Sequence, residues 1–316
     1  MKRTTIKYLT FAGIFLTSVL AHAQQDPQFT HYMYNMNVIN PAYATDNEGV
    51  INVGGLYRTQ WVGAVGAPKT ATVFVHSPIA KRVEMGLSFI NDNIGDVVKE
   101  NNVYLDVAYV IPVSDQHKIS FGVKGGATFF NTDFGGFKYT DEQADPAFAN
   151  NLNRTFPNVG AGTYFFTDHY YIGFSVPNLL TTKHIERSNG IQTTGVEAIH
   201  YFFTGGYVFD LNASLKFKPA FMAKAVSGAP MAFDVTTNFL INERFELGAG
   251  YRFDDSVSGL AAFNITPNLR IGYSYDYTLS NLGNYNSGTH EIFLLFDLDR
   301  NNLSGSKGYD KSPRFF

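Results

Sequence analysis

The side chains that could support catalysis in this sequence are Ser175, His200 and Asp234. A serine, a histidine and an aspartate hydrolyse esters or amides when they form a hydrogen-bonded triad. All three fall on the same predicted face of their β-strands, but nothing in their spacing brings them together. The sequence also lacks cysteine, a His-x-x-x-His pair, a phosphate-binding glycine loop and a Gly-x-Ser-x-Gly elbow. We therefore expect no enzyme activity, no cofactor and no metal, with a hydrolytic triad as the enzymatic alternative.

A larger set of ionisable side chains alternates with apolar residues and so shares one face of the predicted strands. The basic members are Arg58, Lys124, Lys216, Lys218, Lys224, Arg244, Arg252 and Arg270, and the acidic members are Glu84, Asp106, Asp234, Glu246, Asp276 and Glu291. Enclosed charges need partners. Because neither sign dominates, as it would in a selective pore, we expect a charge network across an enclosed lumen, with a hydrated pore lining as the alternative. The candidate network consists of Arg58, Glu84, Asp106, Lys124, Lys216, Lys218, Asp234, Arg252, Asp276 and Glu291.

The elements that carry these charges have a repeat of two residues, which is typical of β-strands. Between Arg270 and Thr278, one face carries Ile271, Tyr273, Tyr275 and Tyr277, while the other carries charged and small residues. Aromatic residues outside and small or charged residues inside are typical of a membrane barrel. About fourteen segments follow this rule: 50–60, 69–76, 83–93, 99–112, 117–131, 155–166, 169–176, 197–209, 214–226, 230–241, 244–253, 256–265, 268–278 and 288–298.

The connections between these segments alternate in length. The even-numbered ones are short and rich in Asp, Asn, Ser and Pro, which favour tight turns. The odd-numbered ones include the two longest, about 132–154 and 177–196, and also 279–287. Short turns at one rim and long loops at the other are typical of outer-membrane barrels, which predicts that the N terminus and the C-terminal tail lie in the periplasm. Glycines within strands, such as those of Gly122–Gly126, indicate close packing in the wall.

Composition favours the same fold class. Apolar residues make up 45% of the chain and aromatic residues 16%, but charged residues only 16%. No apolar stretch of about 20 residues follows the N-terminal region, which excludes a helical membrane protein and leaves a closed barrel. The net charge of -3 argues against a nucleic-acid partner, because phosphate binding requires a basic face. We predict an all-β protein, a transmembrane antiparallel up-and-down β-barrel of about fourteen strands in the outer membrane.

The sequence divides into four parts. Residues 1–23 resemble a cleaved signal peptide, with three basic residues, a short apolar run and an Ala-His-Ala exit. Residues 24–48 lack periodicity and are predicted to lie under the barrel or to plug its lumen. Residues 49–298 form the barrel. Residues 299–316 form a periplasmic tail that ends in Arg314, Phe315 and Phe316, which are either a frayed end or a periplasmic docking peptide.

Several motifs, taken together and in order, resemble the PorP/SprF family of Bacteroidetes outer-membrane proteins. The mature start QQDPQFTHYMYNMNVINPAYA and the block LYRTQWVGAVGAPKT (Leu56 to Thr70) resemble the family's entry and its most distinctive segment. MGLSFINDNIG, PNVGAGTYFF, VPNLL, IGYSYDYTLSNL, SGTHEI and the final SPRFF follow in the expected order. The resemblance covers the entire mature chain.

The resemblance implies a role in the type IX secretion system and in gliding motility, with no catalytic residues. One implied role is to anchor, or to support the export of, a cognate secreted adhesin with a type B C-terminal signal. The other is a core PorP-like component that contacts the periplasmic ring and its lipoproteins. We favour the SprF-like role, with Trp61, Arg314, Phe315 and Phe316 as candidate partner contacts. A FadL-like transport channel is the alternative from a different class.

Overall fold

The computed structural model describes residues 27–45, 49–95, 97–134, 151–180, 183–188, 191–196, 199–226 and 229–299. The signal peptide predicted for residues 1–23 and the tail residues Arg314, Phe315 and Phe316 lie outside the described residues. The wall is built from β1 (Val50–Thr59), β2 (Lys69–Ala80), β3 (Val83–Ile94), β4 (Val98–Pro112), β5 (Lys118–Thr132), β6 (Asn153–Phe166), β7 (Tyr170–Val176), β10 (His200–Tyr207), β11 (Phe209–Asn212), β12 (Leu215–Val226), β13 (Ala232–Ile241), β14 (Phe245–Arg252), β15 (Ser256–Thr266), β16 (Leu269–Thr278) and β17 (Thr289–Asp299).

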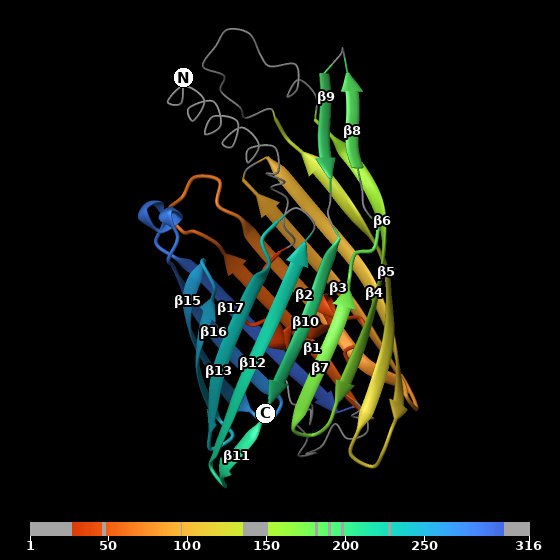
Figure 1. The fold of residues 1–316 in the computed structure, drawn as a ribbon, viewed down its shortest axis with the longest axis vertical. Coiled ribbons are helices and arrows are strands. Elements are labelled where there is room, and N and C mark those ends of the chain that lie inside the picture. Colours follow the sequence, from red (N-terminus) through yellow and green to blue (C-terminus); the bar gives the residue numbers. More distant parts are fainter. Residues whose placement is uncertain are drawn as a thin grey trace, which may run out of the picture.

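These strands form one closed antiparallel barrel (Figure 1). The first and last strands of the wall pair with each other, from Val50 opposite Asp299 to Thr59 opposite His290. The remaining gap is closed because β10 pairs with both β7 and β12. The short β11 continues β10 past Val208 and pairs with the same neighbour, so the wall has fourteen strands. The predicted fold class is therefore confirmed.

The two faces of the wall follow the alternation in the sequence. On β5, Phe121 and Val123 are exposed on the outer surface, whereas Ser120 and Lys124 are buried inside. On β16, the exposed tyrosines likewise alternate with buried polar residues. A continuous apolar outer surface is stable only against lipid. Contact with lipid therefore explains why apolar side chains lie outside and polar ones inside, the reverse of the pattern in a water-soluble protein.

The connections differ between the two ends of the barrel. At one end, the short-turn end, the turns are as brief as Lys81-Arg82 between β2 and β3. At the other end, the long-loop end, the connections include residues 133–152, 177–199 and 279–288. The last of these contains η4 (Asn281–Tyr285).

A separate hairpin of β8 (Lys183–Ser188) and β9 (Ile191–Val196) projects beyond the long-loop end (Figure 1). The sequence had predicted this stretch as loop. Its strands have only six residues each, and strands beyond the lipid need no apolar face, so the alternation that reveals the wall is weak there.

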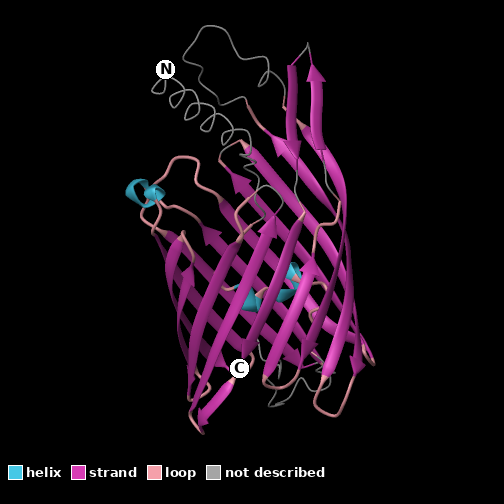
Figure 2. Cartoon of the chain, viewed as in Figure 1, coloured by secondary structure: helices cyan, strands magenta, loops and turns pink. Residues whose placement is uncertain are grey.

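Residues 27–45, here called the lumen segment, lie inside the barrel (Figure 2). The segment contains η2 (Tyr32–Tyr34) and α2 (Met36–Ile39). Met33, Tyr34 and Met36 have no exposed surface and form the core together with inward-facing aromatic residues of the wall. Among the described residues, no helix has the length and apolar character needed to cross a membrane.

Candidate functional site

The lumen segment is held at its start by a buried cluster from three neighbouring strands. The backbone amides of Thr30 and His31 donate to the Glu291 carboxylate at 3.0 and 2.8 Å, and the Thr30 hydroxyl donates to Asp276 Oδ2 at 2.7 Å. Arg58 joins the two carboxylates, with its Nη2 2.9 Å from Asp276 Oδ2 and its Nη1 3.1 Å from Glu291 Oε2. One guanidinium thus balances two acidic groups that would otherwise repel each other in a site shielded from water.

Tyr34 makes a second contact, with Glu246 on β14 and with Arg270 on β16, the strand that also carries Asp276. Its hydroxyl donates a hydrogen bond to Glu246, and the Arg270 guanidinium lies 3.3 Å from the same hydroxyl and 3.5 Å from Glu246. The Lys218 ammonium lies 5.8 Å from the centre of the Tyr34 ring, within the range of a cation–π contact.

The middle of the segment is held through its backbone carbonyl groups. Lys124 Nζ donates to the Val38 carbonyl at 2.6 Å and lies 3.6 Å from Asp106 Oδ1. The Ser175 hydroxyl donates to the Ile39 carbonyl at 2.8 Å. These two wall residues satisfy the carbonyl groups at the end of α2, which have no partner within a helix this short.

Glycines let the segment approach the wall closely. A Cβ atom added at Gly122 would overlap the backbone of Pro41 and Ala42, and one at Gly162 would overlap the Asn40 side chain. Of the glycines in Gly122–Gly126, for which the sequence predicted close packing in the wall, Gly122 therefore packs against the lumen segment.

The segment ends near the short-turn end. The Thr45 amide donates to Glu84 Oε2 at 2.9 Å, and His76 Nε2 lies 3.5 Å from the same oxygen. Glu84 lies next to the turn between β2 and β3, which is at the short-turn end. Arg58 lies near the last residue of β1, which is at the long-loop end. The chain therefore runs through the lumen from the long-loop end to the short-turn end before it enters β1. Pro27 therefore lies at the long-loop end, and the residues before it, on which the prediction of a periplasmic N terminus depends, lie outside the described residues.

The structure places nine of the ten residues of the predicted network inside the lumen, each at most 8% exposed: Arg58, Glu84, Asp106, Lys124, Lys218, Asp234, Arg252, Asp276 and Glu291. Lys216 differs, because it lies at the short-turn end, 4.0 Å from Asp210 and 3.9 Å from Glu243, both of which are exposed. The inward placement predicted for Arg244 is wrong, since that residue is exposed in the turn before β14.

In the described part of the chain these charges form local clusters, and the lumen segment contacts those around Glu291, Glu246, Lys124 and Glu84. Sequence reasoning missed the partners on that segment, Thr30, His31 and Tyr34, because no periodicity marks them. It also missed His76, which the alternation along β2 would have placed inside.

The three candidate triad residues have other contacts. Ser175 donates to Ile39, while Asp234 receives two hydrogen bonds from Arg252, at 2.8 and 2.9 Å. His200 lines a cavity described below. Within the described ranges, no group of three or more metal-ligating side chains is present. Ser175 and Asp234 are therefore bonded to Ile39 and Arg252 rather than to each other.

A cavity of about 650 Å³ lies above the Pro27 end of the lumen segment, at the long-loop end. Its floor includes Pro27 and Gln28, and its mouth includes Trp61, whose amide donates to the Thr289 hydroxyl at 3.1 Å. The charged residues that line it are Arg58, Asp92, Glu100, Arg252, Asp255 and Asp276.

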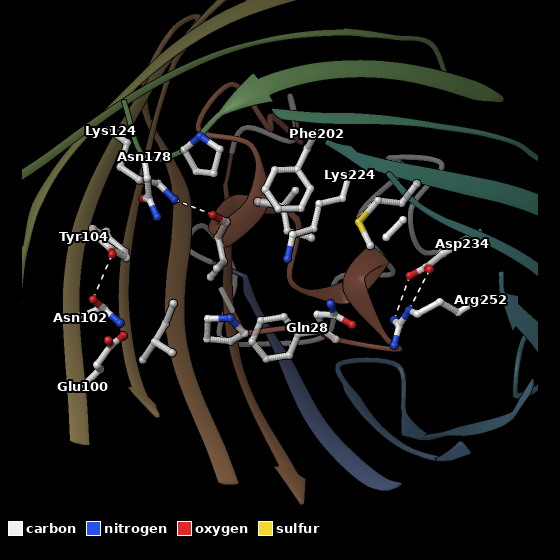
Figure 3. A pocket seen from close by; sticks show the side chains of 18 residues that line it. Gln28, Glu100, Asn102, Tyr104, Lys124, Asn178, Phe202, Lys224, Asp234 and Arg252 are labelled. Carbon is white, nitrogen blue, oxygen red and sulfur yellow. Dashed lines mark hydrogen bonds and ion pairs between the residues drawn. The ribbon is translucent and has the colours of Figure 1, made fainter. Parts of the chain in front are cut away.

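A smaller recess of about 60 Å³ adjoins this cavity and shares Gln28, Glu100 and Arg252 with it. In Figure 3, Gln28 lies between the strand that carries Glu100 and Tyr104 and the strands that carry Asp234 and Arg252. The lumen segment therefore forms the floor of both spaces.

The barrel has a lipid-facing aromatic surface and a polar interior. These features are characteristic of outer-membrane β-barrel proteins. The family model described as type IX secretion system membrane protein PorP/SprF matches residues 21–296. The chain therefore belongs to this family, and the resemblance seen in the sequence is confirmed. No curated protein sequence matches the chain.

Similar solved structures are outer-membrane proteins of low sequence identity. A FadL homologue of Pseudomonas aeruginosa is 12% identical over 88% of this chain and 96% of its own, with a TM-score of 0.48. The toluene transporter TbuX of Ralstonia pickettii is 11% identical over 84% and 93%, with a TM-score of 0.47. Omp33 of Acinetobacter baumannii is 11% identical over 80% and 99%, with a TM-score of 0.44.

Proposed function

We propose that this barrel works in type IX secretion as the outer-membrane anchor, or export partner, of one cognate surface adhesin with a type B C-terminal signal. The family match over residues 21–296 is the observation that carries this proposal. The bonded lumen segment supports it, because a barrel filled from Thr30 to Thr45 is suited to binding rather than to bulk diffusion. In this role the protein has no catalytic activity of its own.

The orientation follows from the same proposal. The long loops face outward toward the adhesin, and the short turns and the tail face the periplasm, where the secretion ring and its lipoproteins lie. A core PorP-like component that contacts this ring is the second candidate from the same family. A FadL-like channel would need an apolar lumen pocket, whereas six charged side chains line the larger cavity here.

Deleting the gene tests the proposed function. We expect one large adhesin to disappear from the cell surface while the other type IX cargo remains, because a dedicated anchor serves one partner. Quantitative proteomics of the shaved cell surface measures this, with the wild-type gene restored in trans as the control. Loss of all type IX cargo would instead indicate the core component. Unchanged cargo with altered solute uptake would favour the channel and contradict the proposal.

The tail provides a second test, on residues outside the described part of the chain. We expect removal of Arg314, Phe315 and Phe316 to weaken co-purification with periplasmic ring components while the barrel still folds, because the tail follows the last wall strand. Affinity purification measures the first effect and heat-modifiable gel migration the second. A barrel that no longer assembles would identify the tail as a folding signal instead of a docking peptide.

A further inference from the structure

The outer surface of the wall carries almost no charge. Outward positions alternate with lumen-facing ones, and in the described wall strands only two outward positions hold Lys, Arg, Asp or Glu: Lys69 on β2 and Lys99 on β4. The carboxylates of Asp92 on β3 and Glu100 on β4 face the lumen and line its cavity. The two ammonium groups therefore lie on a face without carboxylates along these strands.

Strand pairing places the two lysines in one row at the long-loop end. Lys69 pairs with Asn93 on β3, and Asn93 pairs with Lys99. Because neighbouring strands lie about 4.8 Å apart, the two lysines are about 10 Å apart across Asn93. Both are exposed, and neither ammonium group makes an ion pair within the described ranges. Asp133, farther along at the same end, accepts a hydrogen bond from Asn151 at 3.3 Å.

Amide side chains surround the two lysines. Asn93 Nδ2 donates to Asn91 Oδ1 at 2.9 Å, and Asn91 Nδ2 donates to Asn101 Oδ1 at 2.8 Å. Asn131 extends the row beside Lys99. An amide group both donates and accepts hydrogen bonds, as the hydroxyl groups of a sugar do. The surface therefore suits a ligand that combines negative charge with hydroxyl groups. We call it the lysine–asparagine patch, and it consists of Lys69, Asn91, Asn93, Lys99, Asn101 and Asn131.

The patch begins where the apolar outer surface ends. On β4, the outward side chains from Val103 to Ile111 are all apolar or aromatic. These positions span about 27 Å along the strand, or about 20 Å across the membrane at the usual strand tilt. The apolar band of outer-membrane barrels is about 25 Å tall. Asn101 and Lys99 follow directly, at the depth where lipid head groups begin.

We propose that the lysine–asparagine patch binds the phosphorylated sugar head group of a glycolipid in the leaflet at the long-loop end. The lysines contact phosphate, because basic side chains near a membrane surface attract anionic lipids. The asparagines contact sugar hydroxyls, and the acyl chains lie on the apolar surface below, which includes the paired Phe89 and Val103. The carbon stem of a lysine can lie along such a surface while its ammonium group reaches the head group. This lipid site goes beyond the proposed function, since it uses the outer surface of the wall and no cargo.

Native mass spectrometry of the full-length barrel in detergent tests the patch. The probes are lipid A with two phosphates and the same lipid with both phosphates removed. We expect lipid A to bind at least about tenfold more tightly than the dephosphorylated form. The double variant Lys69→Gln with Lys99→Gln should lose about thirtyfold of the lipid A affinity, the loss expected for two surface lysines. Equal binding of the two lipids, or unchanged affinity in the variant, would overturn the proposal.

The short-turn end supplies a matched control. The double variant Lys81→Gln with Lys118→Gln also removes two lysines, at the opposite end of the wall, and should leave the affinity unchanged. If it weakens binding as much as the patch variant, the attraction is a general charge effect and the site is wrong. Replacing Lys69 and Lys99 with arginine keeps both charges and should retain binding. Loss of binding in that variant, with the barrel still heat-modifiable on gels, would contradict phosphate recognition by charge.

A second lipid tests the sugar contacts. Phosphatidylglycerol carries a phosphate and no sugar ring, so we expect it to bind more weakly than lipid A. The double variant Asn91→Ala with Asn101→Ala should weaken lipid A binding and leave phosphatidylglycerol binding unchanged. If phosphatidylglycerol binds as tightly as lipid A, the patch recognises phosphate alone and the assignment to a glycolipid is wrong. Because these measurements use the purified barrel, their outcome is separate from that of the gene deletion.

Discussion

Replacing Gly122 with valine is expected to turn the closed barrel into an ion-conducting pore. A Cβ atom at this position would overlap the main chain of Pro41 and Ala42 in the lumen segment, and a backbone cannot rotate aside as a side chain can. The wall is tied by ladders on both sides of β5, whereas the lumen segment is held mainly by side chains. The segment therefore moves, and the space that it vacates fills with water.

Conductance of single barrels in planar bilayers measures this effect. We expect Gly122→Val to raise the conductance by about tenfold or more, toward that of a variant that lacks residues 27–45, because a barrel of this strand number encloses a wide lumen. Gly125→Val is the matched control, since Gly125 lies on the same strand and a Cβ atom there meets nothing within 4 Å. A folded Gly122→Val barrel that conducts no better than the control would mean that the segment yields without leaving the lumen.

Sequence alone could predict the wall because the lipid imposes one rule on every strand. The alternation predicted fourteen segments. Each corresponds to one strand of the observed wall, with β10 and its continuation β11 counted as one. The rule fails at the rims, where water reaches both faces: Arg244 was misplaced, and Lys216 is half-buried at the short-turn end. It also fails for β8 and β9, which extend beyond the membrane.

The path of the lumen segment could not be predicted for a different reason. Wall surrounds the segment on all sides, so no face of it is exposed and no periodicity arises. The alternation correctly predicted that Glu291 and Lys124 face the lumen. Their hydrogen-bond partners there include the backbone groups of His31 and Val38. Backbone groups carry no sequence signal, and a network inferred from side-chain charges alone therefore lacks the component that connects it.

Replacing Arg58 with alanine is expected to cause the largest loss of stability of any single charge removal in the cluster of Arg58, Asp276 and Glu291. Arg58 is 3% exposed, and its removal leaves Asp276 and Glu291 together without their shared cation. Removing one partner of a buried ion pair costs about 3–5 kcal/mol. Thr30 also loses its donor at 2.9 Å, so the start of the lumen segment loosens and the conductance should rise as well.

Urea unfolding followed by heat-modifiable gel migration measures this loss in folded barrels. Lys216→Ala is the control, because its ion pairs are 3.9 and 4.0 Å long and its partners are exposed, and such pairs contribute about 0–1 kcal/mol. A triple variant, Arg58→Met with Asp276→Asn and Glu291→Gln, should recover much of the stability, since it removes the unpaired charges and keeps similar volumes. If Arg58→Ala is no less stable than Lys216→Ala, the cluster does not hold the lumen segment. If the triple variant is as unstable as Arg58→Ala, the loss comes from packing rather than from uncompensated charge.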